Sequence, residues 1–95
     1  MIIVAGTLRL HAADRAAYLE AAGHATETAR SAPGCLDFAQ SADPLDPERI
    51  NIFERWESDA DLQRFRDLPN DSPAAMPTIR SAEVQRYRVS SVEDA

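Results

Sequence analysis

The segment 50–65 changes its periodicity halfway, and this change constrains the fold more than any other feature of the chain. Residues 50–57 are mostly apolar or aromatic, a composition that favours a half-buried β-strand. Ser58 follows, and its hydroxyl can accept a hydrogen bond from the free amides of a helix that begins at Asp59. The segment therefore predicts a strand that passes directly into a short helix, with the single tryptophan, Trp56, at the end of the strand.

The rest of the chain shows the same alternation of strand and helix patterns. Residues 2–10 place apolar side chains on one face at a spacing of two, and residues 15–31 carry an apolar stripe at helical spacing behind Asp14, the expected cap. We expect strands at 2–10, 35–41, 50–57 and 83–89, helices at 15–31 and from 59 to about 68, and a loop over 70–81. This β-α-β, β-α-β order predicts an α+β, ferredoxin-like fold.

The length of 95 residues predicts one domain, which we place at residues 1–90, followed by a polar, acidic tail at 91–95. A chain of this size is near the lower limit for a self-sufficient core. Apolar residues make up 44% of the sequence, but many of them are alanine. A second subunit would supply the missing buried surface.

Composition excludes several classes of function. The net charge of −6 argues against a nucleic-acid partner, which requires a clustered basic face. One cysteine, Cys35, allows no internal disulfide and fits a reducing compartment. No segment is long enough to span a bilayer, and the N-terminus lacks the pattern of a signal peptide, so we expect a cytoplasmic protein without a membrane partner. His11 and His24 share no ligand spacing, and no metal site is predicted.

Two short motifs carry a family resemblance. Residues 53–58 read Phe-Glu-Arg-Trp-Glu-Ser at the end of the third strand, and residues 33–35 read Pro-Gly-Cys after the first helix. In this order and spacing the chain resembles the antibiotic biosynthesis monooxygenase family of small dimeric α+β barrel proteins. The resemblance implies a four-stranded antiparallel sheet with two helices on one face. It also implies a homodimer and a small-molecule pocket between sheet and helices in each subunit.

The resemblance also implies a chemistry. Members of the quinol-oxidising and polyketide-tailoring branches oxygenate phenolic or quinol substrates with dioxygen, without flavin, haem or metal. For this chain the implied partners are a small aromatic substrate and dioxygen, and no cofactor is expected. The predicted function is a cofactor-independent monooxygenase.

Strand alternation and the family's placement of its tryptophan predict which residues form the catalytic site. Trp56 would point toward the pocket, and Glu54 and Ile52 share its face. Glu54 is the one carboxylate expected under the helices, where desolvation would raise its pKa, and Trp56 could stack on an aromatic substrate. These two residues are the predicted catalytic pair. A structural ion pair for Glu54 and a packing role for Trp56 are the alternatives.

The other residues of the predicted pocket bind substrate. Ile52 would line the pocket, Gly6 would open space on the pocket side of the first strand, and Tyr18 could bond a substrate oxygen or only pack in the core. Leu62 and Phe65, three apart on the second helix, would close over the pocket, and Arg66 could meet an anion at its rim or face solvent.

His24 is a further candidate for the catalytic base, because a histidine side chain can accept a proton. It lies on the first helix, opposite the stripe of alanines at positions 22, 25 and 29. We therefore expect His24 to be exposed to solvent rather than to act as a base.

Two departures from the family keep other functions open. The polyketide-tailoring members carry an asparagine where this chain has Ile52. The haem-degrading branch relies on an asparagine, a tryptophan and a histidine, and the matching places hold Gly6, Phe65 and a loop without histidine, which disfavours haem degradation. The alternatives are a non-catalytic small-molecule-binding or accessory domain, and a cyclase or isomerase in which Glu54 moves a proton without oxygen.

The opposite face of the sheet predicts self-association. Ile3, Ala5 and Thr7 on the first strand and Phe53 on the third would form an exposed apolar patch in a monomer. Pairing two such sheets face to face would bury this patch in an interface that each subunit forms with the same surface.

Overall fold

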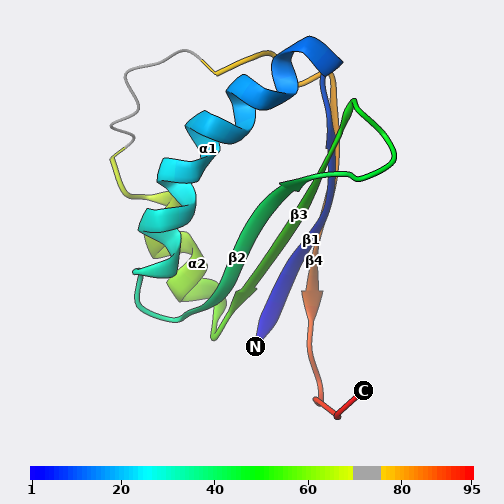
Figure 1. Cartoon of the computed structure of the whole chain (residues 1–95). Helices are drawn as coiled ribbons and strands as arrows, with labels where there is room; N and C mark the ends of the chain where they lie inside the picture. The colour runs from blue at the N-terminus through cyan, green and yellow to red at the C-terminus, as the bar shows by residue number, and fades with distance from the viewer. Residues whose placement is uncertain (70–75) are drawn as a thin grey trace.

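The computed structural model describes residues 1–69 and 76–95. The strands are β1 (Ile2–Arg9), β2 (Cys35–Ala42), β3 (Arg49–Trp56) and β4 (Ser81–Arg88), and the helices are α1 (Arg15–Arg30) and α2 (Asp59–Arg66), with a short 3-10 turn, η1 (Ala12–Asp14), before α1 (Figure 1). Each of these elements lies within a few residues of its predicted position. Part of the loop expected at 70–81 lies outside the described residues.

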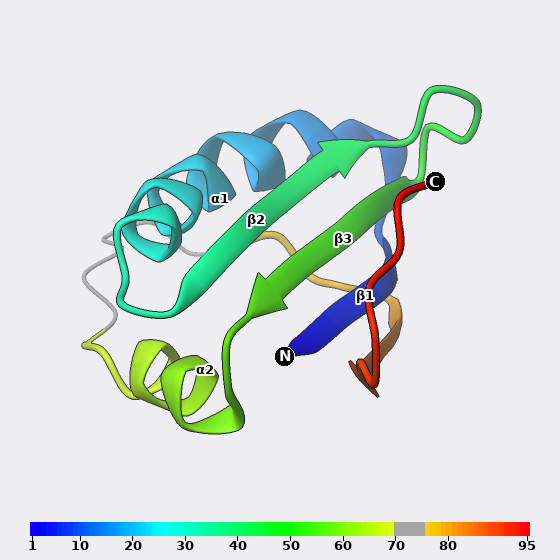
Figure 2. The ribbon, with the colours of Figure 1, turned by 90° about the horizontal axis from the view of Figure 1, so that it is seen from below.

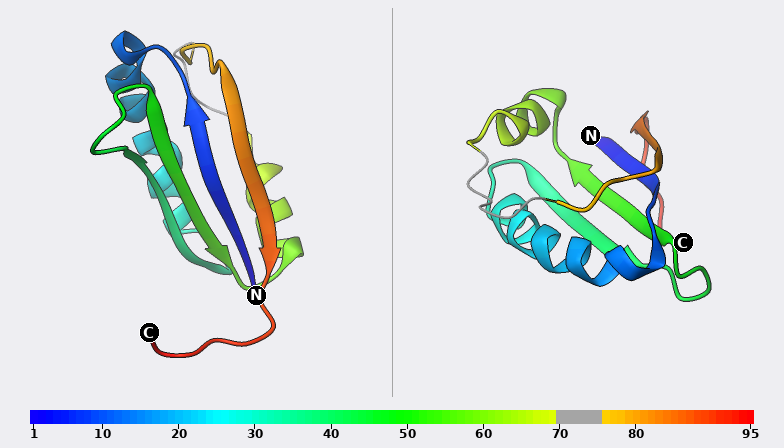
Figure 3. Two further views of the ribbon diagram at one scale, coloured as in Figure 1. Left: turned by 90° about the vertical axis from the view of Figure 1, so that its right-hand side faces the viewer. Right: turned by 90° about the horizontal axis from the view of Figure 1, so that it is seen from above.

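The four strands form one antiparallel sheet in the order β2-β3-β1-β4. Both helices lie on the same face of this sheet, and the other face carries no helix (Figures 2 and 3). The central strand β1 pairs with β3 and β4, and Gly6 lies between Ile52 and Val84. The predicted α+β, ferredoxin-like fold is confirmed.

The predicted alternation of β1 is also confirmed, because Ile2, Val4 and Leu8 are buried toward the helices. The buried side chains on this face form two groups. We call the first the Trp56 cluster, which contains Ile2, Val4, Ala29, Phe38, Trp56 and Leu62. We call the second the Tyr18 cluster, which contains Leu8, Leu10, Tyr18, Ala22, Ile50 and Ile52.

The two helices begin differently. The predicted cap of α2 is confirmed, because Ser58 has an extended backbone and its Oγ accepts a hydrogen bond from the Asp61 amide at 3.2 Å. The predicted cap of α1 is wrong, because Asp14 makes no side-chain capping bond. Asp14 ends η1 and already has a helical backbone, whereas a capping residue needs an extended one.

A tight turn at Gly34 joins α1 to β2 and brings the start of α2 close. Gly34 has a φ of +80°, a left-handed conformation that glycine adopts without strain. A Cβ atom at this position would collide with the Asp61 carboxyl group, and the Gly34 carbonyl accepts a hydrogen bond from the Glu57 amide at 2.9 Å. The turn therefore holds the end of β3, and with it Trp56, against the beginning of α2.

Strand β4 differs from the other three because all of its residues are exposed. Its connection to the helix layer is electrostatic: Arg86 and Arg88 each lie 2.6 Å from the carboxylate of Asp59, at the first residue of α2. Within the described residues, no helix combines the length and apolar character needed to cross a membrane.

Candidate functional site

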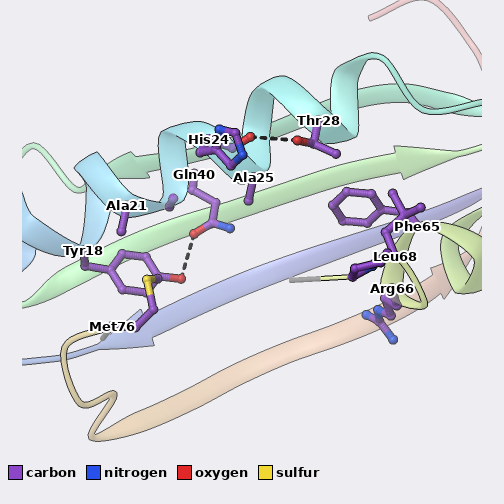
Figure 4. Close-up of a pocket in the computed structure, with 12 residues that line it drawn as sticks. Tyr18, Ala21, His24, Ala25, Thr28, Gln40, Phe65, Arg66, Leu68 and Met76 are labelled. Atoms are coloured by element: carbon purple, nitrogen blue, oxygen red, sulfur yellow. Dashed lines mark hydrogen bonds between the residues drawn. The ribbon is translucent and has the colours of Figure 1, made fainter. Parts of the chain in front are cut away.

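A cavity of about 450 Å³ lies between α1 and the residues at and after the end of α2 (Figure 4). One wall comes from α1 and is formed by Tyr18, Ala21, Ala22, His24, Ala25 and Thr28. The other side is formed by Phe65, Arg66, Leu68, Pro69 and Met76, and Gln40 contributes from β2. The volume lies within the range of roughly 300–1,000 Å³ that is typical of small-molecule sites.

The alanines of α1 explain why this space stays open. Ala21, Ala22 and Ala25 present only methyl groups to the gap, so the helix fills little of it. Ala22 and Ala25 belong to the apolar stripe predicted for this helix, and Ala22 is buried. The same small side chains leave room for a ligand between α1 and Phe65 (Figure 4).

A neutral polar pair lies at one end of the cavity. The Tyr18 hydroxyl donates a hydrogen bond to Gln40 Oε1 at 2.8 Å. Burial raises the pKa of the Tyr18 phenol above its ordinary value of 10.0, so the hydroxyl stays protonated at neutral pH. Gln40 is opposite Ile52 on β3 and shares with it the face that the helices cover. Tyr18, predicted as substrate-binding, therefore reaches the cavity together with a second polar side chain.

Two cationic or titratable side chains also line the cavity. Arg66 is on the side of α2, and its positive charge also acts on Glu54 and partly lowers the pKa of that carboxyl group. His24 is exposed, as predicted, yet it also belongs to the cavity wall. Exposure and a place in the wall are compatible because the cavity opens to solvent beside α1.

The predicted catalytic pair, Glu54 and Trp56, is buried and does not line the cavity. Trp56 Nε1 donates a hydrogen bond to Glu54 Oε1 at 3.0 Å, and Glu54 is only 9% exposed. Burial raises the pKa of Glu54, while the Trp56 hydrogen bond and then the Arg66 charge partly offset this rise. Among the described residues Glu54 forms no ion pair, so the arginine partner considered in the sequence reading is not observed.

Phe65 lies between Trp56 and the cavity. Its ring centroid lies 5.3 Å from that of Trp56, and the Phe65 side chain also lines the cavity. Glu54 and Trp56 are absent from the cavity wall. Of the predicted site, Tyr18, Phe65 and Arg66 thus meet around one space, and the catalytic pair lies outside it.

The remaining predicted substrate-binding residues lie elsewhere. Ile52 and Leu62 are buried within the two core clusters and do not line the cavity. Gly6 does not line it either, and a Cβ atom on Gly6 would collide with the backbone carbonyl of Glu83 on β4. In this structure Gly6 permits close pairing of β1 and β4 rather than adding space to the pocket.

Gln40 and Met76 line the cavity but were not identified from the sequence. A signal for Gln40 existed, because strand alternation places it on the same face as the buried Phe38. No periodicity marks Met76, which follows the segment 70–75. Over residues 1–69 and 76–95, no group of three or more His, Cys, Asp or Glu side chains is arranged to hold a metal ion.

These features define the class of the protein: an α+β domain with a ferredoxin-like fold and a cavity between its two helices. The sequence model of the antibiotic biosynthesis monooxygenase family matches residues 1–72, so the chain belongs to this family. No curated protein sequence matches the chain.

Solved structures support the same fold. A protein of this family from Deinococcus radiodurans is 20% identical with a TM-score of 0.82, over 100% of this chain and 98% of that one. Another from Chloroflexus aurantiacus is 28% identical with a TM-score of 0.78, over 98% and 96% of the two chains. A heme degrader from Mycobacterium tuberculosis, with two hemes in its active site, is 18% identical with a TM-score of 0.73, over 99% and 100%.

Proposed function

We propose that this protein is a cofactor-independent monooxygenase that oxidises a small phenolic or quinol-like aromatic compound with dioxygen. The observation that supports this most is the cavity itself, which is largely apolar and contains a neutral hydrogen-bonding pair. A buried carboxyl group of raised pKa, Glu54, accepts a hydrogen bond from Trp56, which packs against Phe65 of the cavity wall. Membership in the antibiotic biosynthesis monooxygenase family supports the reaction class.

The reaction asks for few protein groups. A phenol or quinol loses a proton, and the electron-rich anion reacts with dioxygen in a site that excludes water. For a quinol, one oxygen atom enters the ring and the other leaves as water, and the quinol itself supplies all the electrons. The protein must therefore bind the ring, accept one proton and stabilise the anion.

The proposed roles follow from position and charge. Glu54 accepts the proton, since burial brings its pKa closer to the working range of a general base, and Trp56 orients its carboxylate through the indole N–H. Phe65 must turn aside for a substrate to touch Glu54, because its ring lies between Trp56 and the cavity. Arg66 stabilises the anion from the cavity wall.

Oxygen uptake with 1,4-naphthohydroquinone tests this proposal. The dialysed protein, free of flavin, haem and metal by absorbance and elemental analysis, should form the hydroxylated quinone with one labelled atom from ¹⁸O₂. Glu54→Gln should lower kcat while leaving the fold intact, and His24→Asn serves as the comparison for a base on the cavity rim. An oxygen uptake no faster than autoxidation without protein would end the proposal, and turnover under argon would indicate an isomerase or cyclase instead.

A non-catalytic binding or accessory domain is the second candidate. It is favoured by one observation, which is that Glu54 and Trp56 do not line the cavity. Ligand binding that persists in Glu54→Gln without any oxygen uptake by the wild type would support this candidate.

We further propose that the protein is a cytoplasmic homodimer. The sheet face without helices carries Phe53, which is 38% exposed, and Tyr87, which is 50% exposed. On the same face the Arg55 Nε atom is buried and has no hydrogen-bond partner among the described residues. A second sheet packed against this face would bury the aromatic rings and could supply an acceptor to Arg55.

Phe53→Asp should abolish the dimer, because each carboxylate would enter a dry interface without a partner. Light scattering at micromolar concentration measures the result. Leu45→Asp, at a position that is 93% exposed, is the matched control and should leave the dimer intact. A wild type that scatters as a monomer would refute the dimer.

A further inference from the structure

The Tyr18–Gln40 pair has hydrogen-bonding capacity that the protein itself does not use. The Tyr18 hydroxyl donates to Gln40 Oε1, and no partner for the Gln40 amide nitrogen is found in the described part of the chain. Figure 4 shows this nitrogen on the side of the amide that faces away from Tyr18, toward the space in front of Phe65. The oxygen of the Tyr18 hydroxyl also keeps a free lone pair. The pair thus presents both free donors and free acceptors.

The presence of both does not depend on which way the Gln40 amide is turned. If the amide were reversed, its nitrogen would donate to the Tyr18 oxygen, and the phenol O–H would become a free donor. Gln40 Oε1 would then be a free acceptor. In either orientation, one hydrogen bond inside the pair leaves at least one donor and at least one acceptor for a ligand, provided that the phenol is neutral.

A hydroxyl group is the ligand group that matches such a pair, because it can donate and accept at one oxygen atom. A quinone carbonyl or an ether oxygen only accepts, so the acceptor of the pair would stay unsatisfied. A carboxylate also only accepts, and it brings a charge that neither Tyr18 nor Gln40 neutralises. The pair therefore distinguishes the reduced, hydroxylated form of an aromatic ring from its oxidised form.

The surrounding wall fits a ring attached to that hydroxyl. Ala21 and Ala25 lie beside the pair on α1, Met76 lies next to Tyr18, and Phe65 faces them across the cavity (Figure 4). These side chains offer apolar surface on both sides of the polar pair. A flat aromatic ring can occupy this space with its hydroxyl directed at Tyr18 and Gln40.

We propose that Tyr18 and Gln40 form a hydroxyl-recognising pair that selects a neutral phenol or quinol over a ligand that can only accept hydrogen bonds. This inference deepens the proposed function and rests on it only in taking the cavity as the substrate site. Loss of one hydrogen bond, worth about 0.5–1.5 kcal/mol net, corresponds to a roughly two- to tenfold weaker affinity for the oxidised form.

Binding without turnover tests the proposal. Isothermal calorimetry of the intact protein with 1-naphthol, 1-methoxynaphthalene and naphthalene measures hydroxyl preference. Anaerobic titration with 1,4-naphthohydroquinone and 1,4-naphthoquinone measures preference for the reduced form. The wild type should bind each hydroxylated ligand about two- to tenfold more tightly than its partner that cannot donate.

The double variant Tyr18→Phe/Gln40→Met is the decisive one. It removes both polar groups together, so no unsatisfied group is left behind, and it should bring both ratios to about one while naphthalene binds as before. Thr28→Val is the matched control, since Thr28 lines the same cavity and its hydroxyl bonds the His24 carbonyl; the preference should persist. A double variant that keeps the wild-type preference overturns the proposal, as does a wild type with no preference.

These outcomes are separable from those of the proposed oxygenase activity. A wild type that prefers hydroxylated ligands but takes up no oxygen would refute the monooxygenase function and support the recognition pair. An enzyme that consumes oxygen but binds naphthol and methoxynaphthalene equally would have the proposed function without this pair as its selector.

Discussion

The two core clusters on the helix-covered face are each joined to a polar side chain by one hydrogen bond, but only one of the two bonded pairs reaches the cavity. One member of each cluster forms a hydrogen bond with a polar side chain outside it: Trp56 donates to Glu54, and Tyr18 donates to Gln40. In the Trp56 cluster, Phe65 packs against the indole ring, and neither Trp56 nor Glu54 lines the cavity. The Tyr18–Gln40 pair reaches the cavity directly.

The difference arises from where α2 lies rather than from the strands. Both pairs occupy inward-facing positions, and Glu54 and Gln40 are only one pleat apart across the β2–β3 pairing. The Gly34 turn and the Ser58 cap hold α2 at the Trp56 end. At the other end α1 alone covers the sheet, and its alanines leave space. Burial of a polar pair therefore does not by itself predict whether the pair can meet a ligand.

Trp56→Ala should have the largest effect on stability. Trp56 is fully buried, and its removal leaves a large cavity and takes away the hydrogen bond to Glu54. The free energy of unfolding should fall by about 3–5 kcal/mol, measured by denaturant titration. Leu45→Ala, at an exposed loop position, should change it by less than about 0.5 kcal/mol. A much smaller decrease in the free energy of unfolding would mean that the Trp56 cluster is not closed to solvent.

Glu54→Gln should change how stability depends on pH. The pKa of Glu54 is raised in the folded protein, so the folded state binds more protons than the unfolded state between the ordinary pKa of 4.5 and the higher folded value. The contribution of Glu54 to stability is thus fully present below pH 4.5 and is lost as pH rises through the folded pKa. Denaturant titrations from pH 4 to 8 should show that the free energy of unfolding of Glu54→Gln increases relative to that of the wild type across this window. A constant difference would show that Glu54 is well solvated.

Tyr18→Phe should cost less than Trp56→Ala, because the ring remains and only the 2.8 Å hydrogen bond to Gln40 is lost. The free energy of unfolding should fall by about 1 kcal/mol. For a domain of this size, that corresponds to a melting temperature lower by about 4–8 °C. A loss above 3 kcal/mol would place Tyr18 in a sealed core like that of Trp56 and would argue against an open cavity.

Gly23→Ala should give the smallest effect, and in the opposite direction. Gly23 is on the exposed side of α1, and an added Cβ atom would meet nothing within 4 Å. Alanine should raise the free energy of unfolding by about 0.5–1 kcal/mol through its higher helix propensity, without touching either cluster. Thermal unfolding measures the gain, and ligand affinity should stay unchanged. A loss of affinity would mean that α1 must bend for binding.

The sequence predicted more of the fold than of the site. Every strand and α-helix was placed within a few residues, and the inward positions of Glu54 and Trp56 were predicted from the family's placement of its tryptophan combined with the period of two. For the site, Tyr18, Phe65 and Arg66 were identified and line the cavity, whereas Ile52 and Leu62 are core residues.

The errors have physical causes. Alternation specifies the face on which a side chain lies, but not whether a helix or a cavity lies above it. Gln40 was therefore not identified, although alternation gives its face. His24 is exposed, as predicted, but its place in the cavity wall did not follow from the sequence. Asp14 was expected to cap α1, but it is the last residue of η1, so its backbone is already helical. Formation of η1 depends on the whole turn and not on Asp14 alone.

The sequence by itself determined the order of elements, the two faces of the sheet and the start of α2 at Ser58. These properties depend on side-chain periodicity and on local hydrogen bonds to the backbone. Only the tertiary structure decided that Phe65 packs on Trp56 while Tyr18 and Gln40 face an open space. That outcome depends on the position of α2 relative to α1, which is set by contacts between segments far apart in the sequence.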